Sequence, residues 1–226
     1  GEIAVMNYAR NAWYVAAWDQ DLPADAPLAM TVLGEPIVLW RSGERVVAME
    51  DRCVHRLAPL SLGRCEDAKL RCMYHGLLFD ADGVCVEIPG QDKIPPQARV
   101  RSYPAVLRHS WVWVWMGDPA LADEGLIPPA VGYDNPDYIL GHGFLDYQAE
   151  ARLINDNLLD FSHLSYVHAN SFGAGPEFAS SQPKLETLER GVRFSRWITN
   201  TLGASVRRSV TTAWADFHWF MPSVRP

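Results

Sequence analysis

The sequence has little cysteine, no long apolar run and no cluster of basic residues, and each shortage excludes a class of protein. Four cysteines in 226 residues are far below the density of a small secreted protein stapled by disulfides. The longest apolar runs, such as the one at 111–116, are much shorter than the roughly 20 residues of a membrane helix. A net charge of -7, with Lys and Arg scattered, disfavours nucleic acid and membrane surfaces as partners. Since no signal-peptide pattern opens the sequence, we expect a soluble cytoplasmic protein that acts on a small molecule or a protein.

The stretch from 31 to 118 consists of short apolar runs separated by turn residues. The Ser-Gly pair at 42–43 and the Asp-Gly pair at 82–83 each stand between two apolar runs, which is a strong local signal for a β-hairpin. In the run at 111–116 three Trp alternate with Val, so their indoles should share one strand face. Packing in a core is favoured over an aromatic binding platform. This half is predicted to be antiparallel β.

A stretch rich in Pro, Gly and Asp at 117–137 is interpreted as a linker, and the pattern changes after it. Apolar residues then recur with a nearly helical period over 153–164, and the Gly-Ala-Gly at 173–175 is predicted to end that helix. Strand-like alternation returns at 192–199 and 213–221. The second half is therefore predicted to mix helix and sheet.

Between the hairpin signals the sequence places a Cys and a His one residue apart and then, sixteen residues later, a Cys and a His two residues apart. Structural zinc sites usually bring their Cys as one close pair and their His as another, whereas here each limb is mixed. A [2Fe-2S] cluster in which two His replace two Cys on one iron needs this set. Cys53 and Cys72 would bind one iron, and His55 and His75 the other. Because imidazole donates less negative charge than thiolate, such a cluster has a raised potential and relays single electrons.

Two other interpretations of these four residues stay open. They could be buried Cys and loop His of an ordinary β domain, although this spacing rarely arises by chance. They could also bind a structural zinc ion. Cys65 and Cys85 lie outside the pattern and are interpreted as structural, because free Cys mostly behaves as a small apolar residue.

A second group of polar residues lies in the predicted helical segment, namely Asn157, Asp160, His163 and His168. On one helix face the Asp160 carboxylate could orient the His163 imidazole, three residues away. His168 is five residues beyond His163, or about 140° around an ideal helix, so both reach one metal only if the helix distorts or ends between them. Alone, the segment favours two unrelated His. Beside an electron relay, two His and a carboxylate indicate the site with which non-heme Fe(II) oxygenases activate O2.

These motifs make the sequence resemble the Rieske non-heme iron oxygenases, specifically the oxygenase components of the vanillate O-demethylase, dicamba O-demethylase and toluenesulfonate methyl-monooxygenase type. The similarity covers about residues 7–170 and is most specific in the two metal motifs. It rests on the segments RNAWYVAAW (10–18), CVHRLAPLSLG (53–63), CMYHGLLFD (72–80), VEIPGQDKIPP (86–96), WVWMGDPALAD (113–123) and INDNLLDFSHLSYVH (154–168).

The resemblance implies an α+β chain that assembles as a head-to-tail homotrimer. An N-terminal all-β Rieske [2Fe-2S] domain at 7–118 would precede a partial α+β catalytic domain, with an antiparallel sheet, at 119–226. The family's third iron ligand is an Asp far downstream in a longer chain. We therefore expect that this sequence is truncated, or that it lacks internal segments after about residue 170.

The resemblance also implies roles for the residues of the second group. His163 and His168 would bind a mononuclear Fe(II), and Asn157 would lie near that iron. Asp160 would act in catalysis as the bridge between His75 of one subunit and His163 of the next.

The implied reaction uses O2 and electrons from a separate NAD(P)H-dependent reductase, with or without a ferredoxin, to hydroxylate or O-demethylate a methyl or methoxy group of a small aromatic substrate. No Gly-rich dinucleotide fingerprint is present, so NAD(P)H should bind to the reductase. Two alternatives are a Rieske-type electron carrier without oxygenase chemistry and a zinc-stabilised binding module. Four arginines could anchor an acidic substrate group, although surface charge is the favoured interpretation; they are Arg193, Arg196, Arg207 and Arg208.

Overall fold

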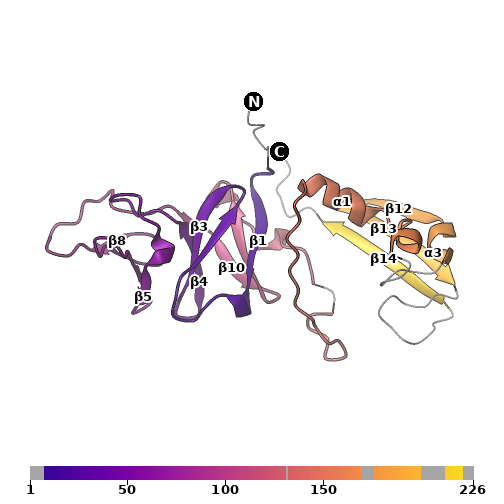
Figure 1. The fold of residues 1–226 in the computed structure, drawn as a ribbon, viewed down its shortest axis with the longest axis horizontal. Coiled ribbons are helices and arrows are strands. Elements are labelled where there is room, and N and C mark those ends of the chain that lie inside the picture. The colour runs from indigo at the N-terminus through magenta and orange to yellow at the C-terminus, as the bar shows by residue number, and fades with distance from the viewer. Residues whose placement is uncertain (1–7, 131, 169–175, 200–211, 221–226) are drawn as a thin grey trace. The chain divides into compact units, whose positions relative to one another are not determined.

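The computed structural model describes residues 8–130, 132–168, 176–199 and 212–220. The chain forms two compact units, one built mainly from residues 1–135 and the other from residues 136–221 (Figure 1). The domain boundary at 118 that the resemblance implies stays a prediction.

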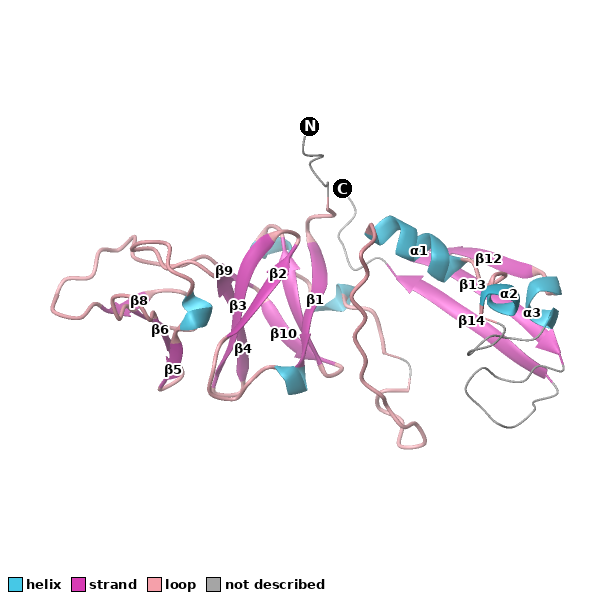
Figure 2. Ribbon diagram, viewed as in Figure 1, coloured by secondary structure: helices cyan, strands magenta, loops and turns pink. Residues whose placement is uncertain are grey.

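The first unit contains two antiparallel sheets that share one apolar core (Figure 2). Ile37 and Leu39 from one sheet and Val112 and Val114 from the other belong to the same buried cluster. The four-stranded sheet has the order β2 (Leu28–Val32), β3 (Glu35–Ser42), β4 (Arg45–Glu50) and β9 (Ser102–Tyr103). The three-stranded sheet has the order β1 (Ala12–Trp18), β11 (Trp111–Met116) and β10 (Ala105–Arg108).

The other face of the four-stranded sheet carries the candidate site. Side chains alternate along a strand, so Val38 and Trp40 of β3 point away from Ile37 and Leu39 and join a second buried cluster. That cluster also contains buried residues of a small antiparallel sheet. Its order is β5 (Arg64–Glu66), β6 (Lys69–Arg71), β7 (Leu78–Phe79) and β8 (Cys85–Glu87). The predicted cluster loops lie before β5 and between β6 and β7.

Both predicted hairpins are confirmed. Gly43, with a φ of 62°, turns the chain between β3 and β4, and Gly83, with a φ of 79°, turns it between β7 and β8. The φ values lie in the region that glycine enters without a steric penalty. The indole face of β11 is also confirmed as core, because Trp113 and Trp115 pack in one buried cluster with Trp13 of β1.

The predicted linker is wrong over its first part, which packs on the first unit. Two short 3-10 turns, η3 (Pro119–Leu121) and η4 (Glu124–Leu126), begin at Asp118 and Asp123, whose carboxylates accept the N–H two residues on. The indole N–H groups of Trp13 and Trp115 donate to the Asp123 and Asp118 carbonyls, each over 2.8 Å. The polar residues of this stretch therefore cap two 3-10 turns that pack on the first unit, and this part is not an unstructured linker.

Among its described residues, the second unit contains a three-stranded antiparallel sheet and three short helices, which confirms the α+β class of the chain. Its elements are α1 (Ala151–Leu159), α2 (Leu164–Val167), α3 (Pro176–Ser180), β12 (Pro183–Leu188), β13 (Gly191–Thr199) and β14 (Thr212–Phe220), with the sheet order β12-β13-β14. The two strands predicted here are confirmed. The single helix predicted over 153–164 is wrong, because α1 ends at Leu159. Residues 173–175 lie outside the described residues. Throughout the described ranges, no helix combines the length and the apolar character that crossing a membrane requires.

Candidate metal centres

Two loops of the first unit carry the four predicted cluster ligands, and their backbones follow the same hydrogen-bond pattern. In each loop the Cys N–H donates to the carbonyl five residues on, over 2.8 Å. The Cys carbonyl accepts the N–H four residues on, over 2.9 Å after Cys53 and 3.2 Å after Cys72. Those fourth residues, Leu57 and Gly76, have positive φ values of 59° and 75°. The loops are therefore alike in backbone, although His follows at the second position in one and at the third in the other.

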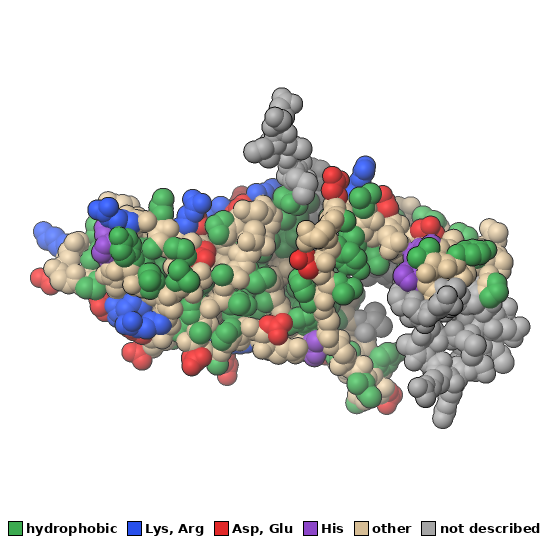
Figure 3. Space-filling view, in the orientation of Figure 1, with side chains coloured by type: hydrophobic (Ala, Val, Ile, Leu, Met, Phe, Trp, Pro, Cys, Tyr) green, Lys and Arg blue, Asp and Glu red, His purple; other side chains and the backbone are tan. Residues whose placement is uncertain are grey.

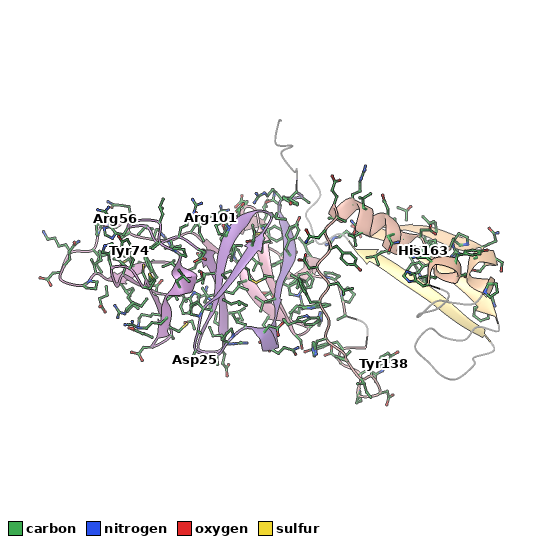
Figure 4. The ribbon with its side chains drawn as sticks, viewed as in Figure 1. Asp25, Arg56, Tyr74, Arg101, Tyr138 and His163 are labelled. Carbon is green, nitrogen blue, oxygen red and sulfur yellow. The ribbon has the colours of Figure 1, made fainter. Side chains whose placement is uncertain are left out.

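The imidazoles of His55 and His75 meet between these loops. Their Nδ1 atoms lie 3.1 Å apart, and the ring centroids lie 4.4 Å apart in an edge-to-face arrangement. Metal–imidazole bonds are about 2 Å long, so two nitrogens at this separation can bind one metal. Both rings are exposed, and the ring of Tyr74 lies 3.9 Å from that of His75. Figure 4 labels Tyr74 and Arg56 at this end of the unit.

The thiols of Cys53 and Cys72 lie deeper than the imidazoles, and each residue is only 2% exposed. Burial is the main cause that raises the pKa of Cys53 to about 11, and the adjacent Cys72 thiol adds to it. Because thiolate rather than thiol binds metal, occupation of this site must expel protons. The site thus has a buried sulfur end and an exposed nitrogen end.

This arrangement fits a two-iron cluster better than a single ion. The ligands form two pairs, one of sulfur and one of nitrogen, as a cluster with thiolates on one iron and imidazoles on the other requires. A structural zinc ion needs four ligands around one point. In the part of the chain that the structure describes, no three His, Cys, Asp or Glu side chains are grouped so as to hold one ion. The donor set therefore fits the Rieske-type cluster.

An open cavity of about 500 Å³ adjoins the two imidazoles. Its walls are mainly apolar and include Val54, Leu77, Ile88 and Pro89. Histidine, basic and apolar side chains gather on this end of the unit in Figure 3. The imidazole end is therefore the end through which a partner can approach the site.

The end of the first loop is hydrogen-bonded to the start of the same loop and packs against the strand that leads into the second loop. Ser61 donates to the Asp51 carboxylate from its N–H over 2.7 Å and from its hydroxyl over 2.5 Å. Gly63 lies so close to β6 that a Cβ there would collide with the backbone carbonyl oxygen of Arg71. Because Arg71 directly precedes Cys72, the two ligand loops are packed on each other through their backbones.

The second predicted group surrounds the break between α1 and α2. Asp160 follows the last residue of α1, and His163 and His168 flank α2 on either side, with their ring centroids 5.4 Å apart. The expectation that Asp160 and His163 share one helix face is wrong, because the helix ends before both of them. The break places the two imidazoles close together.

Asp160 contacts the turn that carries His163 through both its backbone carbonyl and its carboxylate. Its carbonyl contacts His163 Nδ1, which leaves Nε2 as the nitrogen for a metal. Its carboxylate accepts the Ser162 N–H over 2.9 Å. Asn157 is exposed on α1, and its carbonyl accepts the Asp160 N–H over 3.3 Å.

Arg196 of β13 is 4% exposed, so its interpretation as surface charge is wrong. Its guanidinium donates to the Ser162 hydroxyl over 2.9 Å and to the Ser181 carbonyl over 3.1 Å. Arg196 therefore holds the residue that directly precedes His163. No local signal could have indicated this role, because the two residues lie on separate elements. Arg207 and Arg208 lie outside the described residues.

The donor set of the second centre fits part of a non-heme iron site. Non-heme Fe(II) oxygenases bind iron with two His and one carboxylate. Among the described residues, His163 and His168 are not joined by a third ligand-type side chain in a group able to hold a metal. The residues here thus supply the two imidazoles of such a site.

Two family descriptions match the chain. Residues 12–104 match the Rieske [2Fe-2S] domain, and residues 147–225 match the vanillate O-demethylase oxygenase C-terminal domain. The first match contains all four cluster residues, and the second contains Asn157, Asp160, His163 and His168.

Among characterised relatives, the iron-sulfur subunit of the toluene-4-sulfonate monooxygenase system of Comamonas testosteroni is 42% identical over 96% of this chain and 65% of its own length. The oxygenase component of dicamba O-demethylase of Stenotrophomonas maltophilia is 44% identical over 72% of this chain and 48% of its own length. A crystal structure of dicamba monooxygenase bound to 3,6-dichlorosalicylic acid has a TM-score of 0.86 and 33% identity, over 97% of this chain and 70% of that chain. The chain thus spans just under two thirds of the first of these relatives.

Proposed function

The chain belongs to the Rieske non-heme iron oxygenases, and from this membership we propose that it acts in the terminal oxygenase component of a multicomponent monooxygenase. The observation that carries the proposal is the meeting of the His55 and His75 Nδ1 atoms, 3.1 Å apart, above two buried thiols. The match to an oxygenase C-terminal domain favours an oxygenase over an electron carrier without its own chemistry.

In the first centre, Cys53 and Cys72 would hold one iron of the cluster, and His55 and His75 would hold the other. The cluster, when bound, accepts and passes on one electron at a time. The chain's own residues keep the thiolates dry and leave the imidazole edges accessible, so electrons enter and leave at the exposed end. A separate reductase that uses NAD(P)H supplies them, with or without a ferredoxin.

In the second centre, His163 and His168 would bind an Fe(II) ion, which would supply the chemistry of O2 activation. The Asp160 carbonyl orients the His163 ring so that Nε2 faces the metal, and Arg196 and Ser162 fix the turn that carries both groups. Asn157, on the preceding helix, would lie near the same centre.

The two centres act together in a head-to-tail homotrimer, in which Asp160 of one subunit bridges His75 of another to its own His163. The exposure of both His75 and Asp160 supports this role, since a bridge between subunits needs both groups at a surface. A carboxylate that accepts hydrogen bonds from two imidazoles orients both rings and couples the metals that they bind.

The substrate is a small aromatic compound with a methyl or methoxy group, which the enzyme hydroxylates or O-demethylates. The proposal is supported by the names of relatives of this chain, which are toluene-4-sulfonate monooxygenase, dicamba O-demethylase and vanillate O-demethylase.

Reconstitution of the full chain with iron and sulfide under anaerobic conditions tests the proposal. We expect bound iron and inorganic sulfide in the stoichiometry of a [2Fe-2S] cluster, the visible spectrum of a Rieske protein, and additional iron that is lost when His163 and His168 are both replaced by Ala. A colourless protein that binds zinc in place of iron would refute the cluster. A protein that holds the cluster but binds no additional iron that depends on His163 and His168 would refute the oxygenase.

A further inference from the structure

Arg71, the residue directly before Cys72, makes more side-chain contacts at the cluster site than its place on a short strand requires. Its side chain is 16% exposed. The guanidinium donates to the Gly76 carbonyl over 2.8 Å, to Glu66 over 2.6 Å and to Glu87 over 3.0 and 3.4 Å. A residue that only held the loop through Gly76 would not need the contacts to Glu66 and Glu87.

The bond to Gly76 closes the second ligand loop. Gly76 directly follows His75, so the Arg71 side chain spans from the residue before the first ligand of the loop to the residue after the second. The backbone also closes this loop, with a bond of 2.8 Å from Cys72 N–H to the Leu77 carbonyl and a longer one of 3.2 Å from Gly76 N–H to the Cys72 carbonyl, where the equivalent bond of the first loop is 2.9 Å. The first loop has Ser61 and Asp51 at its end instead. The side chain of Arg71 therefore strengthens the weaker of the two loop closures.

The same guanidinium also pairs with two carboxylates, those of Glu66 and Glu87. Hydrogen bonds from Arg71, and then from Arg64, hold the pKa of Glu66 below its usual range, and bonds to Glu87 and Glu66 raise the pKa of Arg71. The Arg71 side chain thus forms ion pairs with both carboxylates. Arg64 contacts Glu66 with a side chain that is 69% exposed.

We propose that Arg71 is a positioning residue for the cluster, which holds the loop at 72–76 in its metal-binding shape and raises the cluster's reduction potential by offsetting the charges of Glu66 and Glu87. This inference rests on the proposed cluster, and it assigns Arg71 a role toward that group without making it a ligand.

The direction of the effect follows from charge. Reduction of the cluster by one electron adds one negative charge, which a nearby cation stabilises and a nearby anion destabilises. Removal of the Arg71 charge should lower the potential, and removal of the Glu87 charge should raise it. A residue that acted only on the shape of the loop would not give shifts of opposite sign.

Four variants of the full chain separate charge from shape. Arg71→Gln removes both the charge and the hydrogen bond to the Gly76 carbonyl. Arg71→Lys keeps the charge but loses the forked contacts of the guanidinium. Glu87→Gln removes the opposing charge. Arg64→Gln is the matched control, because it removes a cation from the same network without touching the loop. The measurements are the midpoint potential at pH 7, by redox titration followed in the visible spectrum, and the rate of cluster loss to a chelator, with circular dichroism as a check of folding.

We expect a lower potential in Arg71→Gln, a higher one in Glu87→Gln and a much smaller shift in Arg64→Gln. Cluster loss should be about 10- to 100-fold faster in Arg71→Gln, as for other residues that orient metal ligands, and intermediate in Arg71→Lys. If Arg71→Gln does not fold, the sign of the shift in Glu87→Gln and the cluster loss of Arg71→Lys decide alone. If the wild type holds its cluster but the potentials of the variants do not shift, or those of Arg71→Gln and Glu87→Gln shift in the same direction, the inference is overturned and the proposed function stays intact. A wild type without a cluster overturns both.

Discussion

At the scale of single residues, the four ligand side chains differ most in their exposure. Cys53 and Cys72 are buried, whereas His55 and His75 are exposed. Residue type and spacing alone predicted the set, because few sites use one sulfur and one imidazole from each of two loops. Exposure was not predictable, since it depends on how the loops pack over the sheet. In the cluster that we propose, the exposed imidazoles would face a partner and the thiols would stay away from water.

The buried thiol gives a pH dependence to the metal-free protein. The pKa of Cys53 is raised from 9.0 to about 11, mainly by burial, so the folded state favours the protonated thiol. Its contribution to stability is complete below pH 9 and is lost as the pH rises toward 11. We expect the urea midpoint of the metal-free protein to fall over this range and to fall less in Cys53→Ser. An equal fall in both proteins would contradict the assignment.

At the scale of elements, the ligand loops depend on close backbone packing at Gly63. A Cβ at this position would collide with the Arg71 carbonyl oxygen and would lie 2.9 Å from that of Leu60, and neither backbone group can rotate away. Gly63→Ala should therefore cost about 1–3 kcal/mol of stability, as overpacking does, and should reduce the yield of cluster. Chemical denaturation and the absorbance of the cluster measure the two effects.

Gly90→Ala is the matched control for that substitution. Gly90 has a positive φ of 77° but no atom within 4 Å of its Cβ position, so its replacement costs only backbone strain of about 1–2 kcal/mol. It should leave the yield of cluster unchanged. A Gly63→Ala protein with a normal yield would show that the packing of the two loops does not shape the site.

The turn between α1 and α2 depends on a buried cation from another element. Arg196→Met keeps the length of the side chain but removes the donors to Ser162 and Ser181. We expect faster hydrogen exchange at the amides of 162–167 and no change in the first unit. Arg193→Met is the control, on the same strand but with a side chain that is 39% exposed, and it should leave hydrogen exchange unchanged both at 162–167 and in the first unit. Unchanged exchange in Arg196→Met would refute the support that we assign to it.

Local sequence signals predicted the β elements well and the helical segment only in part. The Ser-Gly and Asp-Gly turns and the alternating Trp of β11 each carry their own structural preference, so the hairpins and the indole face were predictable. The end of α1 at Leu159 was not, because apolar spacing continues past it and the break is stabilised by Asp160, Ser162 and Arg196. Arg71 and Arg196 act across elements, and their roles follow only from the packed structure.

At the scale of the whole molecule, the chain is described as two units, and the proposed enzyme needs both. The first unit contains the four candidate cluster residues, and the second contains His163 and His168, the two candidate iron ligands. Each of them matches its own family description. In the trimer that we propose, catalysis depends on transfer of an electron between subunits, so a substitution can leave both metals bound and still stop turnover.

Asp160→Asn tests that dependence in the assembled oxygenase. The side chain keeps its size but loses the charge that would orient two imidazoles, so we expect both metals and the trimer to persist while the rate of electron transfer falls by at least about 10- to 100-fold. Asp156→Asn, on the exposed side of α1, is the control and should react as the wild type does. In single-turnover experiments with O2 and substrate, oxidation of the cluster at the wild-type rate in Asp160→Asn would refute the bridge.

Pulsed EPR of the reduced full chain tests the central claim most directly, namely that His55 and His75 bind one iron of a [2Fe-2S] cluster through nitrogen atoms 3.1 Å apart. We predict couplings from two different imidazole nitrogens. The variants His55→Cys and His75→Cys should each lose one coupling and have a lower potential, since thiolate stabilises the oxidised cluster. A reduced cluster without nitrogen couplings, or variants that keep both of them, would contradict the account.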